Sequence, residues 1–220
     1  MLKGIISLVG VSAILSGLAL LFCVISMFIR RKFRVQSSVV REVEQIPFRN
    51  IRWAFLFNCG FYLIPVVTKH GFPADILPAV SLLLIILADI DILIRFLPFE
   101  FQLLLFFFCF FTERGHILWY DKIVGFLVPA ALLFGIYQLI MKRQSEGQIG
   151  FGFSDVLFGG CIGMIAGWYD GLLSIAAGLV LFGLFSGILL LRGADKKKAV
   201  ALTPFFVFGL QIVQLFNPGA

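Results

Sequence analysis

Long apolar stretches constrain this 220-residue chain more than any other feature. The first, Ile5 to Ile29, holds no charged residue and exceeds the ~20 residues that a helix needs to cross a bilayer. Within hydrocarbon, backbone N–H and C=O groups must pair inside the protein, so only helices and closed barrels span membranes. A barrel would show short segments of alternating polarity. The sequence therefore predicts an all-α, polytopic membrane helix bundle.

Charged residues and turn residues divide the chain into about eight predicted spans. Their bounds lie near 5–29, 53–68, 73–90, 99–112, 123–141, 156–168, 172–191 and 199–216. The second, fourth and sixth are shorter than ~20 residues, so they need their flanks, a small tilt or a locally thin bilayer to cross. No polar region is long enough for a separate soluble core. Residues 1–220 are therefore predicted to form a single membrane domain.

Basic residues predict the orientation, because cytoplasmic loops of membrane proteins carry an excess of Lys and Arg. With the N-terminus outside, most of the 18 Lys and Arg residues fall on the cytoplasmic side, many of them in a basic connector over residues 30–52. The exceptions are Lys3, Lys69, Arg114 and Lys122. The net charge of +6 thus reports orientation and does not indicate nucleic acid as a partner. The first span is too long for a cleaved signal peptide, so we expect it to be retained.

The cysteines and histidines predict no metal site and no other cofactor. The four cysteines lie far apart in apolar segments, without the C-x-x-C spacing of metal or redox sites, and are expected to act as small buried hydrophobes. The two histidines, His70 and His116, fall in loops on the outer side.

Three acids near span ends are the candidates for chemistry, because ionisable groups at membrane depth are costly and usually functional. Asp89 and Asp91 end the third predicted span, and Asp155 opens the sixth from the same membrane face. Two carboxylates in a partly dry site cannot both ionise at low cost, so one keeps a proton while the other acts as a base. Such a pair can activate water against a peptide carbonyl and protonate the carbonyl oxygen. This is the chemistry of an aspartyl protease.

Other roles for these acids remain open. Asp155 at a helix N-terminus can act as a cap, and an Asp at a span end can lie among lipid headgroups. The alternative function is that of a non-catalytic polytopic membrane protein: a degenerate enzyme, an assembly subunit or a small ion-coupled transporter. Transport is disfavoured, because a proton path needs acids at several depths and the predicted spans 123–141, 172–191 and 199–216 contain none.

Two motifs surround the candidate acids. Residues 90–98 read IDILIRFLP, in which Asp91 lies seven residues before Pro98, and residues 150–155 read GFGFSD. The first resembles the aspartate motif of the type IV prepilin peptidase family, and the second resembles its G-x-G-x-G-D motif, the signature of GxGD-type intramembrane aspartyl peptidases. The resemblance implies Asp91 and Asp155 as the catalytic pair, with Asp89 as the less fitting acid. The supporting motif positions are Gly150, Gly152, Ser154, Arg95 and Pro98.

The likeness extends over residues 74–216, where Gly167-Trp168 and the segment TPFFVFG at 203–209 fall in the family's order. Ser154 departs from the glycine usual before the second aspartate, and Leu157 replaces a lysine. The connector over residues 30–52 contains no cysteine, so the chain resembles a short form without the N-terminal Cys-motif domain. No methyltransferase activity is therefore expected.

The resemblance implies a multi-pass enzyme of the bacterial cytoplasmic (inner) membrane. Its activity would be the removal, at the cytoplasmic face, of the short basic leader from prepilin-like precursors: type IV pilins, pseudopilins or competence pilins. The expected partners are these precursors and membrane lipid, and a second copy of the chain is a further candidate.

Overall fold

The computed structural model describes Gly17 and residues 48–68, 78–94, 97, 99–111, 118–143, 151–193 and 200–216. These residues form seven α-helices and no strand, so the predicted all-α fold is confirmed for them. The helices are α3 (Phe48–Thr68), α4 (Pro78–Ile94), α5 (Phe99–Phe111), α6 (Trp119–Arg143), α7 (Phe153–Ala166), α8 (Trp168–Leu191) and α9 (Thr203–Phe216).

Two sequence predictions fall largely outside the described residues. The predicted first span, residues 5–29, lies outside the described residues except for Gly17. Residues 30–47 of the predicted connector also lie outside them. The bound predicted for the end of the connector is wrong, because its last residues, 48–52, belong to α3. The predicted bound followed charge, but the stretch FRNIR contains no Gly or Pro and Arg is a good helix former, so the helix includes these residues.

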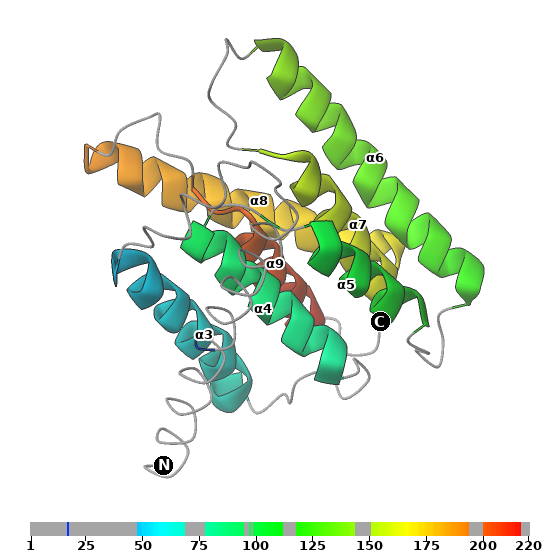
Figure 1. The fold of residues 1–220 in the computed structure, drawn as a ribbon, viewed down its shortest axis with the longest axis horizontal. Coiled ribbons are helices and arrows are strands. Elements are labelled where there is room, and N and C mark those ends of the chain that lie inside the picture. Colours follow the sequence, from blue (N-terminus) through cyan, green and yellow to red (C-terminus); the bar gives the residue numbers. More distant parts are fainter. Residues whose placement is uncertain are drawn as a thin grey trace, which may run out of the picture.

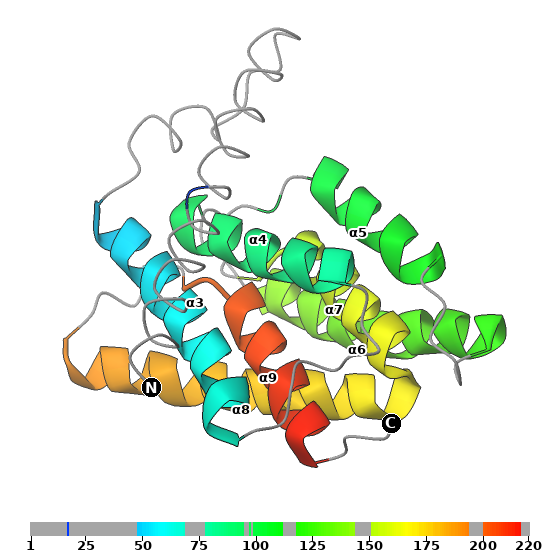
Figure 2. The same ribbon diagram turned by 90° about the horizontal axis from the view of Figure 1, so that it is seen from below.

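Successive helices run in opposite directions, so their ends gather at two ends of the bundle (Figures 1 and 2). The Asn50 side chain at the start of α3 donates a hydrogen bond to the carbonyl of Leu93 at the end of α4, at 2.9 Å. Lys122 at the start of α6 donates to the carbonyl of Phe110 at the end of α5, also at 2.9 Å. We call the end that holds the start of α7 the Asp155 end, and the other the opposite end.

Helix α7 is the centre of the bundle. Eleven of its 14 residues are buried, and it packs against α5, α6, α8 and α9. Glycines allow this close packing: a Cβ on Gly125 of α6 would meet the backbone of Gly163 in α7, and a Cβ on Gly171 of α8 would meet the same residue. Small residues at close helix crossings are typical of membrane bundles. The turn from α7 to α8 depends on Gly167, whose φ of 86° favours glycine.

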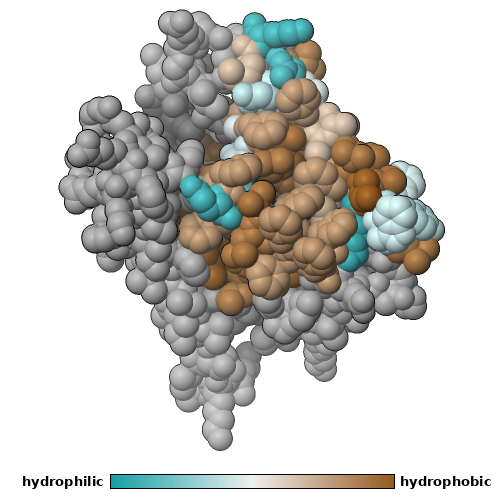
Figure 3. Space-filling model, turned by 45° about the vertical axis from the view of Figure 1, so that its right-hand side comes forward, coloured by the Kyte–Doolittle hydropathy of each residue, from teal (hydrophilic) through white to brown (hydrophobic). Residues whose placement is uncertain are grey.

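Two described helices are long and apolar enough to cross a membrane, over residues 119–142 of α6 and 168–191 of α8. Only 17% of the residues in each apolar window are buried, whereas the core helix of a soluble protein is mostly buried. The exposed apolar surface is extensive on the face shown in Figure 3. These features indicate a membrane protein.

The predicted count of about eight spans is not supported by helix length. Helices α5, α7 and α9 are apolar, but they have 13, 14 and 14 residues. A helix that crosses the hydrocarbon core without further adjustment needs ~20 residues. The described part of the chain therefore supports two spans by this criterion.

Candidate active site

Asp91 lies in the last turn of α4 and is bound by α9. The backbone N–H of Thr203, the first residue of α9, donates a hydrogen bond to Oδ2 of Asp91 at 3.0 Å. This N–H is available because the first N–H groups of a helix have no partner within the helix. Pro204 suits the same turn, where a missing N–H costs nothing. The Asp91 side chain is only 7% exposed.

Asp155 is the third residue of α7 and caps the start of that helix. Its Oδ2 accepts a hydrogen bond from the N–H of Gly152 at 2.7 Å. The capping role considered from the sequence is therefore present. Gly152 has φ −106° and ψ 164°, an extended conformation open to any residue, so its backbone does not require glycine. Asp155 is also 7% exposed.

The carboxylates of Asp91 and Asp155 lie close enough to interact electrostatically. Helices α5 and α9 bring them together, because each of these two helices packs against both α4 and α7. Like charges at so little exposure repel, so ionisation of one acid disfavours ionisation of the other. One backbone N–H fixes an oxygen of each carboxylate, which holds the pair in a defined orientation.

Asp89, the acid directly before the first motif, makes a different contact. Its Oδ2 accepts a hydrogen bond from the side-chain amide of Asn58 in α3 at 2.7 Å. Two residues correspond to a rotation of about 200° around a helix. Asp91 therefore meets α9 while Asp89 meets α3, and only Asp91 is paired with Asp155.

Gln102 is a site residue that the sequence analysis missed. Its amide Nε2 donates to the carbonyl oxygen of Ser154, next to Asp155, at 3.1 Å and so joins the starts of α5 and α7. The one sequence feature that could have identified Gln102 is its side-chain amide in the otherwise apolar segment FQLLLFFF. No sequence feature predicted the hydrogen bond from the Thr203 backbone, although Thr203 belongs to the segment TPFFVFG that resembles the family.

The remaining predicted positions divide in two. Ser154 opens α7 beside Asp155 and accepts the Gln102 bond, whereas Arg95, Pro98 and Gly150 lie outside the described residues. Among the described residues, no group of three or more His, Cys, Asp or Glu side chains is arranged to hold a metal ion. Of the cysteines there, Cys109 and Cys161 are buried and Cys59 is half-buried, and all three are free thiols.

Comparison of the chain with protein-family models, with curated proteins and with solved structures found no match. The likeness to prepilin peptidases thus depends on the motifs in residues 90–98, 150–155 and 203–209.

Proposed function

We propose that this chain is a multi-pass membrane aspartyl endopeptidase of the prepilin peptidase type, with Asp91 and Asp155 as its catalytic pair. The observation that carries the proposal is the meeting of these two acids. They come from helices distant in the sequence, are 7% exposed, and interact with each other. A capping role explains Asp155 alone but gives no reason for a second carboxylate beside it.

In the proposed mechanism, the ionised member takes a proton from water as the water oxygen attacks the carbonyl carbon of the scissile peptide. The protonated member donates its proton to the carbonyl oxygen, which gives a tetrahedral gem-diol intermediate. As this intermediate collapses, the proton taken from water passes to the leaving nitrogen, and the other carboxylate regains its proton from a hydroxyl group of the intermediate. The N–H groups of Thr203 and Gly152 hold the two carboxylates in position. Gln102 fixes the start of α7 and acts as a positioning residue.

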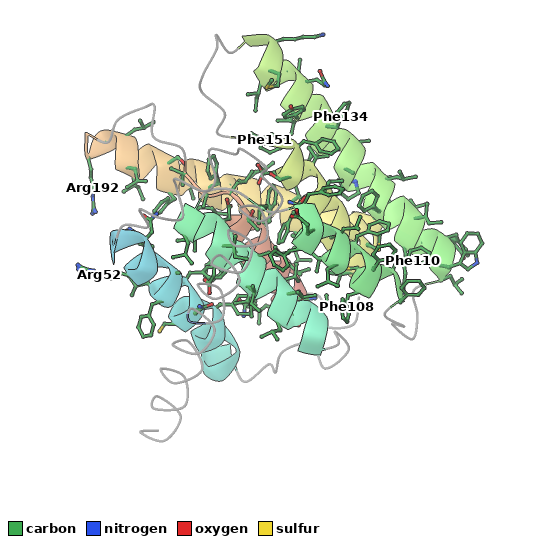
Figure 4. The ribbon with its side chains drawn as sticks, viewed as in Figure 1. Arg52, Phe108, Phe110, Phe134, Phe151 and Arg192 are labelled. Carbon is green, nitrogen blue, oxygen red and sulfur yellow. The ribbon has the colours of Figure 1, made fainter. Side chains whose placement is uncertain are left out.

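The distribution of side chains at the two ends supports a membrane orientation. Three basic residues lie at the Asp155 end: Arg52, Lys142 and Arg192. Figure 4 shows Arg52 and Arg192 at one edge of the bundle. The opposite end carries exposed aromatic residues at the starts of α6 and α8: Trp119, Tyr120, Trp168 and Tyr169. Basic residues mark cytoplasmic ends, and Trp and Tyr favour the membrane interface. We infer that the Asp155 end is cytoplasmic.

The alternating helix directions support more crossings than helix length alone. If α3 to α9 each cross once and residues 5–29 cross as well, the chain spans the membrane eight times with its N-terminus outside. The short helices α5, α7 and α9 would then cross where the protein thins the bilayer or buries their ends. The buried centre of the bundle at α7 fits this arrangement.

The proposed substrates are prepilin-like precursors, which present an apolar helix in the membrane and a short basic leader at the cytoplasmic face. Their scissile bond would lie at the same depth as an acid pair at the Asp155 end. No metal or nucleotide is required for this reaction.

The test is co-expression with an epitope-tagged prepilin-like precursor, followed by electrophoresis. Asp91→Asn and Asp155→Asn should each reduce processing by ~10²-fold or more, because each removes one member of the acid–base pair. Asp170→Asn is the matched control: Asp170 is a first-turn acid of similar burial, 8% exposed, at the opposite end. Processing that survives both dyad substitutions, with equal protein levels in the membrane, would refute the enzyme proposal and leave the non-catalytic alternative.

A further inference from the structure

A second buried acid lies between α3 and α4, outside the proposed dyad. Asp89 and Asn58 are both 0% exposed. The Asn58 amide donates to Oδ2 of Asp89 at 2.7 Å. The other carboxyl oxygen of Asp89, Oδ1, is buried and has no hydrogen-bond partner in the described part of the chain.

An ionised carboxylate at this position would be poorly compensated. It offers about four acceptor sites and needs several donors or a cation when removed from water. In the described residues, Asn58 is the one polar partner of Asp89. Arg52 is the nearest basic residue along α3, but it is exposed and six positions before Asn58, about 9 Å along the helix axis. A buried charge without a partner is strongly destabilising.

A protonated carboxyl group removes this difficulty. The neutral acid has no charge to desolvate, so protonation removes the larger part of the cost of burying a group whose Oδ1 has no hydrogen-bond partner in the described part of the chain. Its Oδ2 still accepts the amide N–H of Asn58, as the 2.7 Å distance requires. The neutral acid therefore suits the surroundings of Asp89 better than the carboxylate does.

We propose that Asp89 and Asn58 form a proton-binding site within the bundle, at which Asp89 is held as a neutral acid that fastens α3 to α4. The site is independent of the proposed proteolysis, because Asp89 contacts α3 whereas Asp91 contacts α9. It lies between two other amide contacts of α3. These run from Asn50 to the carbonyl of Leu93 and from Gln211 of α9 to the carbonyl of Phe61.

The test is infrared difference spectroscopy of the full-length protein in membranes at neutral pH, wild type minus Asp89→Asn. Asparagine keeps the shape of a neutral aspartic acid, so the variant should fold and process precursors as the wild type does. The difference spectrum should show the carbonyl band of one protonated carboxyl group, which shifts in deuterated water. Loss of ionised carboxylate bands in place of that band would overturn the proposal. The outcome does not depend on whether the protein cleaves peptides.

A second measurement needs no variant. Dicyclohexylcarbodiimide is lipid-soluble and reacts with protonated carboxyl groups: the acid proton moves to a carbodiimide nitrogen while the carboxyl oxygen bonds to the central carbon. The product rearranges to a stable N-acylurea with no leaving group. Mass spectrometry of the wild-type protein should find this adduct on Asp89. If Asp89 stays unmodified after treatment of membranes that contain only folded protein, the result would count against the proposal.

Discussion

The close contact of α6 with α7 predicts a large effect for a single added methyl group. In Gly125→Ala, the new Cβ would meet the carbonyl oxygen of Gly163 and approach its carbonyl carbon to 3.0 Å. These are backbone atoms, so no side-chain rotation relieves the overlap and the helices must move apart. Gly135 in the same helix has no neighbouring atom within 4 Å of an added Cβ, so Gly135→Ala is the matched control.

The expected loss of stability follows from comparing Gly125→Ala with Gly135→Ala. Both gain the same helix preference of alanine over glycine, about 0.5–1 kcal/mol. Only Gly125→Ala adds overpacking, which typically costs ~1–3 kcal/mol, and rigid backbone contacts favour the upper value. At ~2–4 °C per kcal/mol for a chain of this size, ~3 kcal/mol lowers the unfolding midpoint by about 6–12 °C relative to Gly135→Ala.

The assay is thermal unfolding of both variants in the same detergent, followed by circular dichroism at a fixed scan rate. The wild type should lie between them, slightly below Gly135→Ala. Equal midpoints for the two variants would refute the proposed close packing of α6 on α7, and with it the arrangement that positions Asp155.

Two further predictions concern the dyad and the membrane orientation. Thr203→Pro removes the backbone N–H that donates to Asp91, at a first helical position where proline is tolerated, so processing should fall about 10-fold. The control Thr203→Val keeps this N–H and should process precursors at the wild-type rate. Equal rates for the two variants would show that this hydrogen bond is irrelevant to processing. In a background without the native cysteines, a cysteine at Tyr120 should react with a membrane-impermeant maleimide in intact spheroplasts, and one at Lys142 only after lysis; the reverse pattern would contradict the inferred orientation.

Local features of the sequence were sufficient to predict the helices and the acids worth examining. Hydrophobic runs and turn residues act over a few neighbouring positions, so the starts and ends of α5, α7 and α8 fall within a few residues of their predicted bounds, whereas α4 is displaced toward the C-terminus. The same locality explains the failure at the connector: charge alone did not reveal that α3 begins at Phe48. Apolar runs predicted about eight spans, whereas two helices in the described part of the chain meet the length criterion, because α5 and α7 form helices shorter than a bilayer.

Only the tertiary structure decided which acids meet. Asp89 and Asp91 are two residues apart, and their separate partners depend on how α4 is rotated against α3 and α9. That rotation is set by packing between segments far apart in the sequence, such as the approach of Gly125 to Gly163, and by polar contacts such as that of Gln102 with Ser154. Helix formation is a local process, whereas the register between helices depends on complementary shapes that no short stretch of sequence contains.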